Sequence, residues 1–257
     1  MTSKNSQSHK PSAAYYKQRW PHSLSSLPNQ TSAKIKRYTL LSWCHWAGLS
    51  SATKLRASGI AYEGVRRLAQ RQEIKARCNA YHNRSHIAQV IIASGLFAQQ
   101  AGLSQTDTDH LIIAALMHDY GHLGHFRNTA PFWQERQSWK KSMAILHRYG
   151  CDGRLVSYFH KWVMATSPAA HLDKARRQDK ITALLVDADL FGSLFLAKPH
   201  VRLLSQAVRF EERLTTELAV FIEQFIKQCE TAGLASQAAK QLHAQLPDGY
   251  SYFKGAS

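Results

Sequence analysis

The apolar residues from Ile35 onward recur with the period of an α-helix, and this pattern constrains the fold more than any other feature. Period-two alternation, which marks half-buried strands, is almost absent. Helix-breaking prolines interrupt the pattern at only four points, namely Pro131, Pro168, Pro199 and Pro247. We therefore expect an all-α fold, a bundle of about nine to twelve helices with its functional site in a cleft where several helix ends converge.

The same periodicity predicts individual helices. The helix after Asn83 presents one apolar face and stops at Gly102, and the segment from Leu111 to Met117 is apolar almost all round, as in a buried central helix. Further helices are expected over residues 153–165 and 180–195. One long amphipathic helix is expected over residues 200–229.

The first 33 residues differ in composition from the rest of the chain. They carry three of the seven prolines, many Ser, Gln and Asn residues, and few aliphatic side chains. A segment of this composition buries too little apolar surface to fold by itself. We expect residues 1–33 to form a disordered basic arm and residues 34–257 to form one catalytic domain.

The chain contains 33 Lys and Arg residues against 17 Asp and Glu, which gives a formal net charge of +16. Such a surface attracts phosphates, nucleic acids or other polyanions.

The sequence contains no apolar run of about eighteen residues and no apolar core of a secretory signal near its start, so we expect a cytoplasmic protein that does not enter a membrane. The cysteines form no CxxC pair, and neither a disulfide framework nor a cysteine zinc site is indicated.

Three polar segments are candidates for chemistry: residues 81–86 (YHNRSH), residues 118–122 (HDYGH) and residues 187–189 (DAD). The histidines in each of the first two lie four residues apart, a spacing that places them on one face of a helix. His118 and Asp119 end the most apolar predicted helix, and burying such groups without partners costs several kcal/mol. A divalent cation would offset that cost, and imidazole with carboxylate suits zinc, manganese, iron or cobalt, or magnesium through water.

Each segment also has a simpler interpretation by itself. One histidine pair can arise by chance among fourteen histidines, and a lone histidine on an apolar face is commonly a hydrogen-bonded core residue. Asp187 and Asp189 suit a helix cap or an ion pair. The three segments together, in this order, favour a metal site.

The same segments resemble the HD-domain phosphohydrolases, in particular the class I 3',5'-cyclic-nucleotide phosphodiesterases. Residues 79–86 (NAYHNRSH) are similar to that family's N-P-Y-H-N-x-x-H, and residues 114–124 (AALMHDYGHLG) to its A-A-x-x-H-D-x-x-H-x-G. Residues 163–166 (VMAT) with His171 resemble V-L-A-T-D-M-S-x-H, and residues 188–190 resemble A-D-L. The resemblance spans roughly residues 78–192.

The resemblance implies a site with two divalent metals, zinc with magnesium or manganese. The first metal would be bound by four side chains: His86, His118, Asp119 and Asp189. Asp119 would bridge to the second metal, with His122 and Thr166 in the surroundings of that metal.

The resemblance also implies a reaction. A metal-bound hydroxide would attack a phosphodiester, most simply a 3',5'-cyclic nucleotide, and His82 would be the general acid that protonates the leaving oxygen. Arg84 and Arg127 are candidate contacts for the substrate phosphate, although each taken singly also suits a solvated surface cation.

The chain departs from the phosphodiesterase pattern at several positions. Gln89 replaces an aspartate, Arg127 stands where an asparagine is expected, and the Glu-Asn-His-His element is not visible, with WKKS at residues 139–142 in about its place. The glutamine that reads the purine cannot be placed. The alternatives that remain open are a nucleotide phosphomonoesterase or triphosphohydrolase of the same superfamily, and a basic nucleic-acid- or nucleotide-binding protein with a structural metal.

Overall fold

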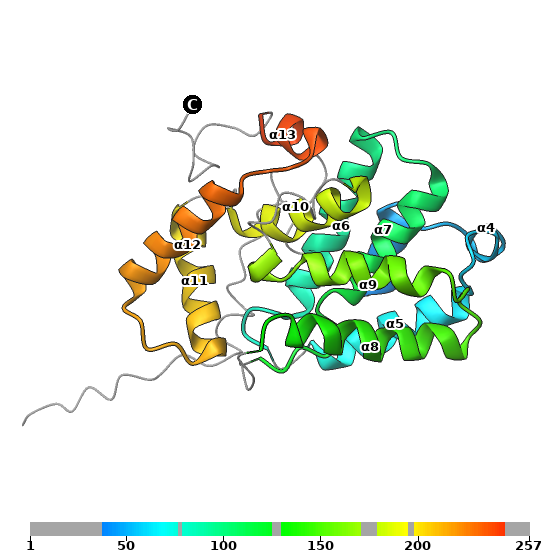
Figure 1. The fold of residues 1–257 in the computed structure, drawn as a ribbon, viewed down its shortest axis with the longest axis horizontal. Coiled ribbons are helices and arrows are strands. Elements are labelled where there is room, and N and C mark those ends of the chain that lie inside the picture. Colours follow the sequence, from blue (N-terminus) through cyan, green and yellow to red (C-terminus); the bar gives the residue numbers. More distant parts are fainter. Residues whose placement is uncertain (1–37, 77–78, 125–129, 171–178, 195–197, 245–257) are drawn as a thin grey trace, which may run out of the picture.

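The structure of the protein is a computed structural model that describes residues 38–76, 79–124, 130–170, 179–194 and 198–244. Within these ranges every regular element is a helix, as Figure 1 shows, which confirms the predicted all-α fold. The elements are α3 (Leu40–Trp46), α4 (Ala52–Ala57), α5 (Tyr62–Lys75), α6 (Arg84–Gln100), α7 (Gln105–Met117), α8 (Trp133–Arg148), α9 (Leu155–Ala165), the 3-10 helix η2 (Pro168–Ala170), α10 (Lys180–Leu194), α11 (Lys198–Glu212), α12 (Leu218–Ala232) and α13 (Gln237–Ala244).

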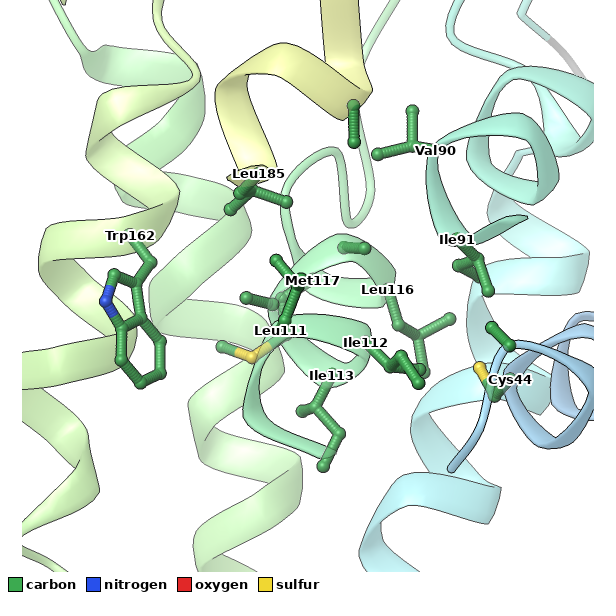
Figure 2. Close-up of a cluster of buried hydrophobic side chains, with 14 of the residues drawn as sticks. Cys44, Val90, Ile91, Leu111, Ile112, Ile113, Leu116, Met117, Trp162 and Leu185 are labelled. Carbon is green, nitrogen blue, oxygen red and sulfur yellow. The ribbon is translucent and has the colours of Figure 1, made fainter. Parts of the chain in front are cut away.

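The hydrophobic core is built around α7. Every side chain from Leu111 to Met117 is fully buried, and α7 contacts α3, α5, α6, α8, α9 and α10. Figure 2 shows this arrangement, with Trp162 of α9 and Leu185 of α10 on one side of α7 and Val90 and Ile91 of α6 on the other. A helix that is apolar all round must be covered on every face, so α7 lies at the centre of the bundle. His118 and Asp119, which follow its last turn, therefore lie in the interior.

Helices α3 and α6 cross at a point where only glycine fits. A Cβ atom added to Gly95 of α6 would lie 2.6–2.7 Å from the Cβ, O and Cα atoms of Ala47, the residue that ends α3. Two of these three atoms belong to the backbone, so no side-chain rotation relieves the contact. The close packing of α3 on α6 therefore depends on Gly95.

We expect Gly95→Ala to lower the free energy of unfolding by about 1–3 kcal/mol, because overpacking forces the two helices apart. Gly153→Ala is the matched control, since a Cβ at Gly153 meets nothing within 4 Å and the residue has no positive φ. Urea unfolding followed by circular dichroism measures both variants. Equal stability of Gly95→Ala and the wild type would contradict this prediction, because it would show that α3 and α6 can move apart without loss of unfolding free energy.

The prediction of a single helix over residues 200–229 is wrong, because the segment forms two helices, α11 and α12, that pack against each other. They lie on the left side of the view in Figure 1. Arg213 has a φ of 54°, a left-handed conformation that ends a helix, and the β-branched pair Thr215 and Thr216 follows it. The break leaves Glu211 at the C-terminal end of α11.

The predicted boundaries of α6, α9 and α10 agree with the structure to within two residues, whereas α7 begins at Gln105, six residues before the predicted apolar segment. Pro199 does not interrupt a helix but lies in the first turn of α11, where a missing backbone N–H leaves no hydrogen bond unmade. The predicted arm of residues 1–33 lies outside the described residues. Among the helices that are described, none combines the length and apolar character needed to cross a membrane.

Candidate metal centre

The structure brings together the four side chains predicted to bind the first metal. His86 lies in the first turn of α6, His118 and Asp119 follow α7, and Asp189 lies on α10. His86 Nε2 is 3.2 Å from Asp119 Oδ2, 3.2 Å from Asp189 Oδ1 and 3.3 Å from His118 Nε2. His118 Nε2 is 3.1 Å from Asp119 Oδ2 and 3.7 Å from Asp189 Oδ1. We call these four residues the metal group.

The metal group fits a divalent cation in two respects. Ligand atoms bound at about 2.0–2.2 Å, with angles between square and tetrahedral, are separated from one another by about 2.8–3.6 Å. Four of the five distances given above fall in that range, and His86, His118 and Asp119 offer ligand atoms that all lie within 4.8 Å of one another. In addition, Asp119 Oδ2 is buried and makes no hydrogen bond. A buried carboxylate oxygen without a hydrogen bond is costly, and a cation would be its partner.

Local backbone interactions orient the two histidines. Asn83 caps α6, because its Oδ1 accepts hydrogen bonds from the backbone N–H groups of Ser85 (2.8 Å) and His86 (3.2 Å). The Nδ1–H group of His118 donates to the carbonyl oxygen of Ala115 at 2.7 Å. This hydrogen bond leaves the Nε2 lone pair of His118 facing the group, which is the usual arrangement of a metal-binding histidine.

The electrostatics of the group favour added positive charge. Burial lowers the pKa of His118, but the negative charges of Asp119 and Asp189, together with hydrogen bonds to Asp119 and Ala115, outweigh burial and raise that pKa to about 9. Burial raises the pKa of Asp119, whereas the charges of His118 and His82 hold it well below its ordinary value. The pKa of Asp189 is lowered in the same way, against burial, by His86 and His118. The two ionised carboxylates are therefore stabilised either by a protonated imidazole or by a metal cation that replaces the proton.

The group has a covered side and an open side. The side chains of His86 and His118 are 4% and 1% exposed, whereas those of Asp119 and Asp189 are 13% and 16% exposed. The side chain of His82 is 19% exposed. A ligand can therefore approach the group from the side of the carboxylates and His82.

A second cluster lies beside the metal group and contains His82, His122 and Glu211. His82 Nδ1–H donates to Glu211 Oε1 at 2.5 Å, and the rings of His82 and His122 stack with their centroids 3.7 Å apart. Burial lowers the pKa of His82, but Asp119 and Glu211 outweigh it and raise the pKa to about 10. Burial and the charge of His82 lower the pKa of His122 to about 3. A charged and a neutral imidazole thus lie face to face.

Sequence reasoning missed Glu211. Its side chain is 2% exposed and also accepts a hydrogen bond from the backbone N–H of Tyr81 at 2.5 Å. Glu211 lies 129 residues after His82 in the chain, and nothing local distinguishes it from Glu212. Only the packing of α11 against residues 80–82, which precede α6, identifies it.

Glu135 was also missed. It lies in the first turn of α8, and its pKa is raised by burial first and by the negative charge of Asp119. The charge of His82 lowers the same pKa, so Glu135 interacts electrostatically with both Asp119 and His82. The WKKS segment at residues 139–142, by contrast, lies in the middle of α8.

The remaining predicted residues have different positions. Thr166 is buried at the end of α9, where its hydroxyl donates to the carbonyl oxygen of Val163 at 2.9 Å. Arg84 forms an ion pair with Glu73, so its guanidinium is already engaged within the chain. Arg127 and His171 lie outside the described residues. A role for Thr166 or Arg84 stays a prediction.

Asp187 and Asp189 point in different directions although they are two residues apart. Asp187 is fully buried and accepts hydrogen bonds from the backbone N–H groups of Ala235 (3.0 Å) and Ser236 (2.7 Å), just before α13 begins. Asp187 thus anchors the start of α13 to α10, as a helix cap would. Asp189 contacts His86 instead.

This division predicts opposite effects of the same substitution at the two positions. Asp189→Asn should lose bound metal with little change in stability in the presence of a chelator. Asp187→Asn should keep the metal and lower the free energy of unfolding by about 1–3 kcal/mol, because one oxygen that accepts from a backbone N–H is replaced by an amino group. Elemental analysis and urea unfolding distinguish the two, and the reverse pattern would contradict this assignment.

Comparisons with known proteins bear on the fold. Neither a protein-family model nor a curated protein matches the chain. A solved structure, the phosphodiesterase domain of the RhoPDE fusion protein from the choanoflagellate Salpingoeca rosetta, matches with a TM-score of 0.55 at 15% sequence identity, over 88% of this chain and 84% of that chain. The chain therefore has a helical fold similar to that of a phosphodiesterase domain.

Proposed function

We propose that this protein is a metal-dependent phosphodiesterase whose preferred substrate is a 3',5'-cyclic nucleotide. The observation that carries the proposal is the metal group itself: the Nε2 atoms of His86 and His118 each lie 3.1–3.7 Å from a carboxylate oxygen of Asp119 and of Asp189, and one of these oxygens makes no hydrogen bond. The similarity of fold to a phosphodiesterase domain supports the same reaction class. His86, His118, Asp119 and Asp189 are the proposed ligands.

A divalent metal held by these residues would activate water and stabilise negative charge on the phosphoryl oxygens. The protein itself supplies the proton for the leaving group. His82 holds a proton on each ring nitrogen, since Glu211 accepts the Nδ1–H group and stabilises the imidazolium. The Nε2–H group is then available to the leaving oxygen, which makes His82 the proposed general acid.

A second metal is a further part of the proposal, with zinc and either magnesium or manganese as the pair. Asp119 would be shared between the two ions, and His122 would lie in the surroundings of the second. The electrostatic interaction of Glu135 with Asp119 supports a second cation, because a further carboxylate that interacts with the group adds negative charge to it. Thr166 is retained as a candidate for the same surroundings.

The test is a substrate screen on the purified full-length chain with Mn²⁺, Mg²⁺ or Zn²⁺ added. We expect metal-dependent conversion of cyclic nucleotides to nucleoside 5'-monophosphates that a chelator abolishes. Activity confined to nucleoside monophosphates or triphosphates would contradict the phosphodiesterase activity and indicate a phosphomonoesterase or a triphosphohydrolase instead. Bound metal without hydrolysis of any of these substrates, or of bis(p-nitrophenyl) phosphate, would contradict an enzymatic role and favour a binding protein.

A further inference from the structure

A pocket with a volume of about 280 Å³ opens between α5 and α8. Four cationic side chains line it, Arg71 and Lys75 from α5 and Lys141 and Arg148 from α8. Arg71 and Lys75 are four residues apart, and Lys141 and Arg148 are seven apart, so each pair lies on one face of its helix. We call this site the basic pocket.

The four cations lack acidic partners. Among the residues that the structure describes, no carboxylate forms an ion pair with any of them. The nearby carboxylates are engaged elsewhere, since Glu63 pairs with neighbouring arginines of α5 and Glu73 pairs with Arg84. Like charges on one helix face destabilise it, and a bound anion would remove that repulsion.

The floor of the basic pocket is not charged. Ile145 and two tyrosines, Tyr120 and Tyr149, also line it, and Tyr120 is only 3% exposed. A cationic rim above an apolar and aromatic floor suits a ligand with phosphate groups and a small organic body. The volume lies just below the usual range for ligand pockets, about 300–1,000 Å³, and therefore suits a small ligand rather than a large cofactor.

The basic pocket is separate from the metal group, because none of the four metal-group residues lines it. The two sites approach each other at the turn that carries Asp119. Tyr120 follows Asp119 directly, and a Cβ added to Gly121 would lie 3.4 Å from Cδ of Lys75 and 3.9 Å from Cδ of Lys141. The lysine stems thus cover one side of this turn.

From the unpaired cations, the apolar floor and the volume, we propose that the basic pocket binds a small phosphorylated molecule, such as a nucleotide or pyrophosphate, at a site other than the metal group. Any occupant would lie against the turn of Asp119. The neighbour of Arg71, Gln72, already holds this turn, since its Nε2 donates to the carbonyl oxygen of Asp119 at 3.2 Å and its Oε1 accepts from the N–H of Gly121 at 3.4 Å.

The test is calorimetric titration of the full-length protein with inorganic pyrophosphate and with AMP, in the presence of a metal chelator. The chelator removes any ion from the metal group, so the outcome does not depend on whether the protein is a phosphodiesterase. Lys75→Gln/Lys141→Gln removes two cations of the pocket. Lys140→Gln/Lys240→Gln changes the net charge equally but alters exposed lysines that do not line the pocket.

We expect saturable binding to the wild type, weakened at least about tenfold in the pocket variant and unchanged in the control variant, because a charge-assisted hydrogen bond to phosphate is lost with each lysine. Circular dichroism verifies that both variants fold. Equally weakened binding in the two variants would show that affinity depends on net charge and not on the pocket, and would overturn the proposal. Absence of saturable binding of either probe up to about 1 mM would also overturn it, as would binding of an oligonucleotide alone.

Discussion

Asp119→Ala should remove both the bound metal and the hydrolytic activity of the protein. Asp119 Oδ2 lies within 3.2 Å of the Nε2 atoms of both His86 and His118, and it is the buried oxygen that lacks a hydrogen bond. Without this carboxylate the group keeps a single ionised partner, Asp189. We expect turnover to fall by at least about three orders of magnitude. Elemental analysis and the substrate screen measure the two losses together.

Two further variants separate loss of charge from loss of fold. Asp119→Asn keeps the size of the side chain and should lose metal in the same way. Asp152→Asn makes the same change in a loop, where the carboxylate pairs locally with Arg154, and should keep both metal and activity. If purified Asp119→Ala retains the metal content of the wild type, the proposed ligand set is incorrect.

His82→Ala should retain the metal while kcat falls by about two to four orders of magnitude, the usual span for general acid catalysis. The metal should stay because His82 Nδ1 is hydrogen bonded to Glu211 and does not belong to the metal group. His147→Ala, at an exposed histidine of α8, is the matched control and should leave kcat unchanged.

The choice of leaving group tests the role of His82 directly. An ester with an alkoxide leaving group needs a proton as its bond breaks, whereas p-nitrophenolate needs little protonation. The variant should therefore lose far more activity on the alkyl ester than on the p-nitrophenyl ester. Equal losses on both esters, with metal retained, would assign His82 to substrate binding, and loss of metal would make it a ligand.

Local sequence patterns predicted much of the fold because they report local free energies. The 3.6-residue period indicated an all-helical chain, and the continuous apolar run from Leu111 to Met117 indicated the central helix. Asn83 predicted the start of α6 because its side chain caps backbone N–H groups two and three residues later. The residues His86, His118 and Asp119 were found as candidates because polar groups at the ends of apolar helices need partners.

Patterns of the same kind failed where the outcome depended on residues distant in the chain. The alternation of Asp187 and Asp189 could not by itself show which carboxylate faces the histidines and which caps α13, and only the resemblance to A-D-L pointed to Asp189. The amphipathic run of residues 200–229 continued past Arg213, although the chain breaks there and folds back. In each case the local preference was weak and the packing of one helix on another decided the result.

The sequence by itself therefore determined the helical class of the fold and the position of α7 in the core. It also singled out His86, His118 and Asp119 as polar groups at helix ends, and the resemblance of residues 188–190 to A-D-L added Asp189 to them. The tertiary structure alone decided that Asp187 turns away from the histidines while Asp189 contacts His86, that Glu211 partners His82 across 129 residues, and that the cations of α5 and α8 line one pocket. The physical reason is the range of the interactions. Helix periodicity and capping act within about one turn, whereas ion pairs, buried hydrogen bonds and pockets form between surfaces that meet only after the helices pack.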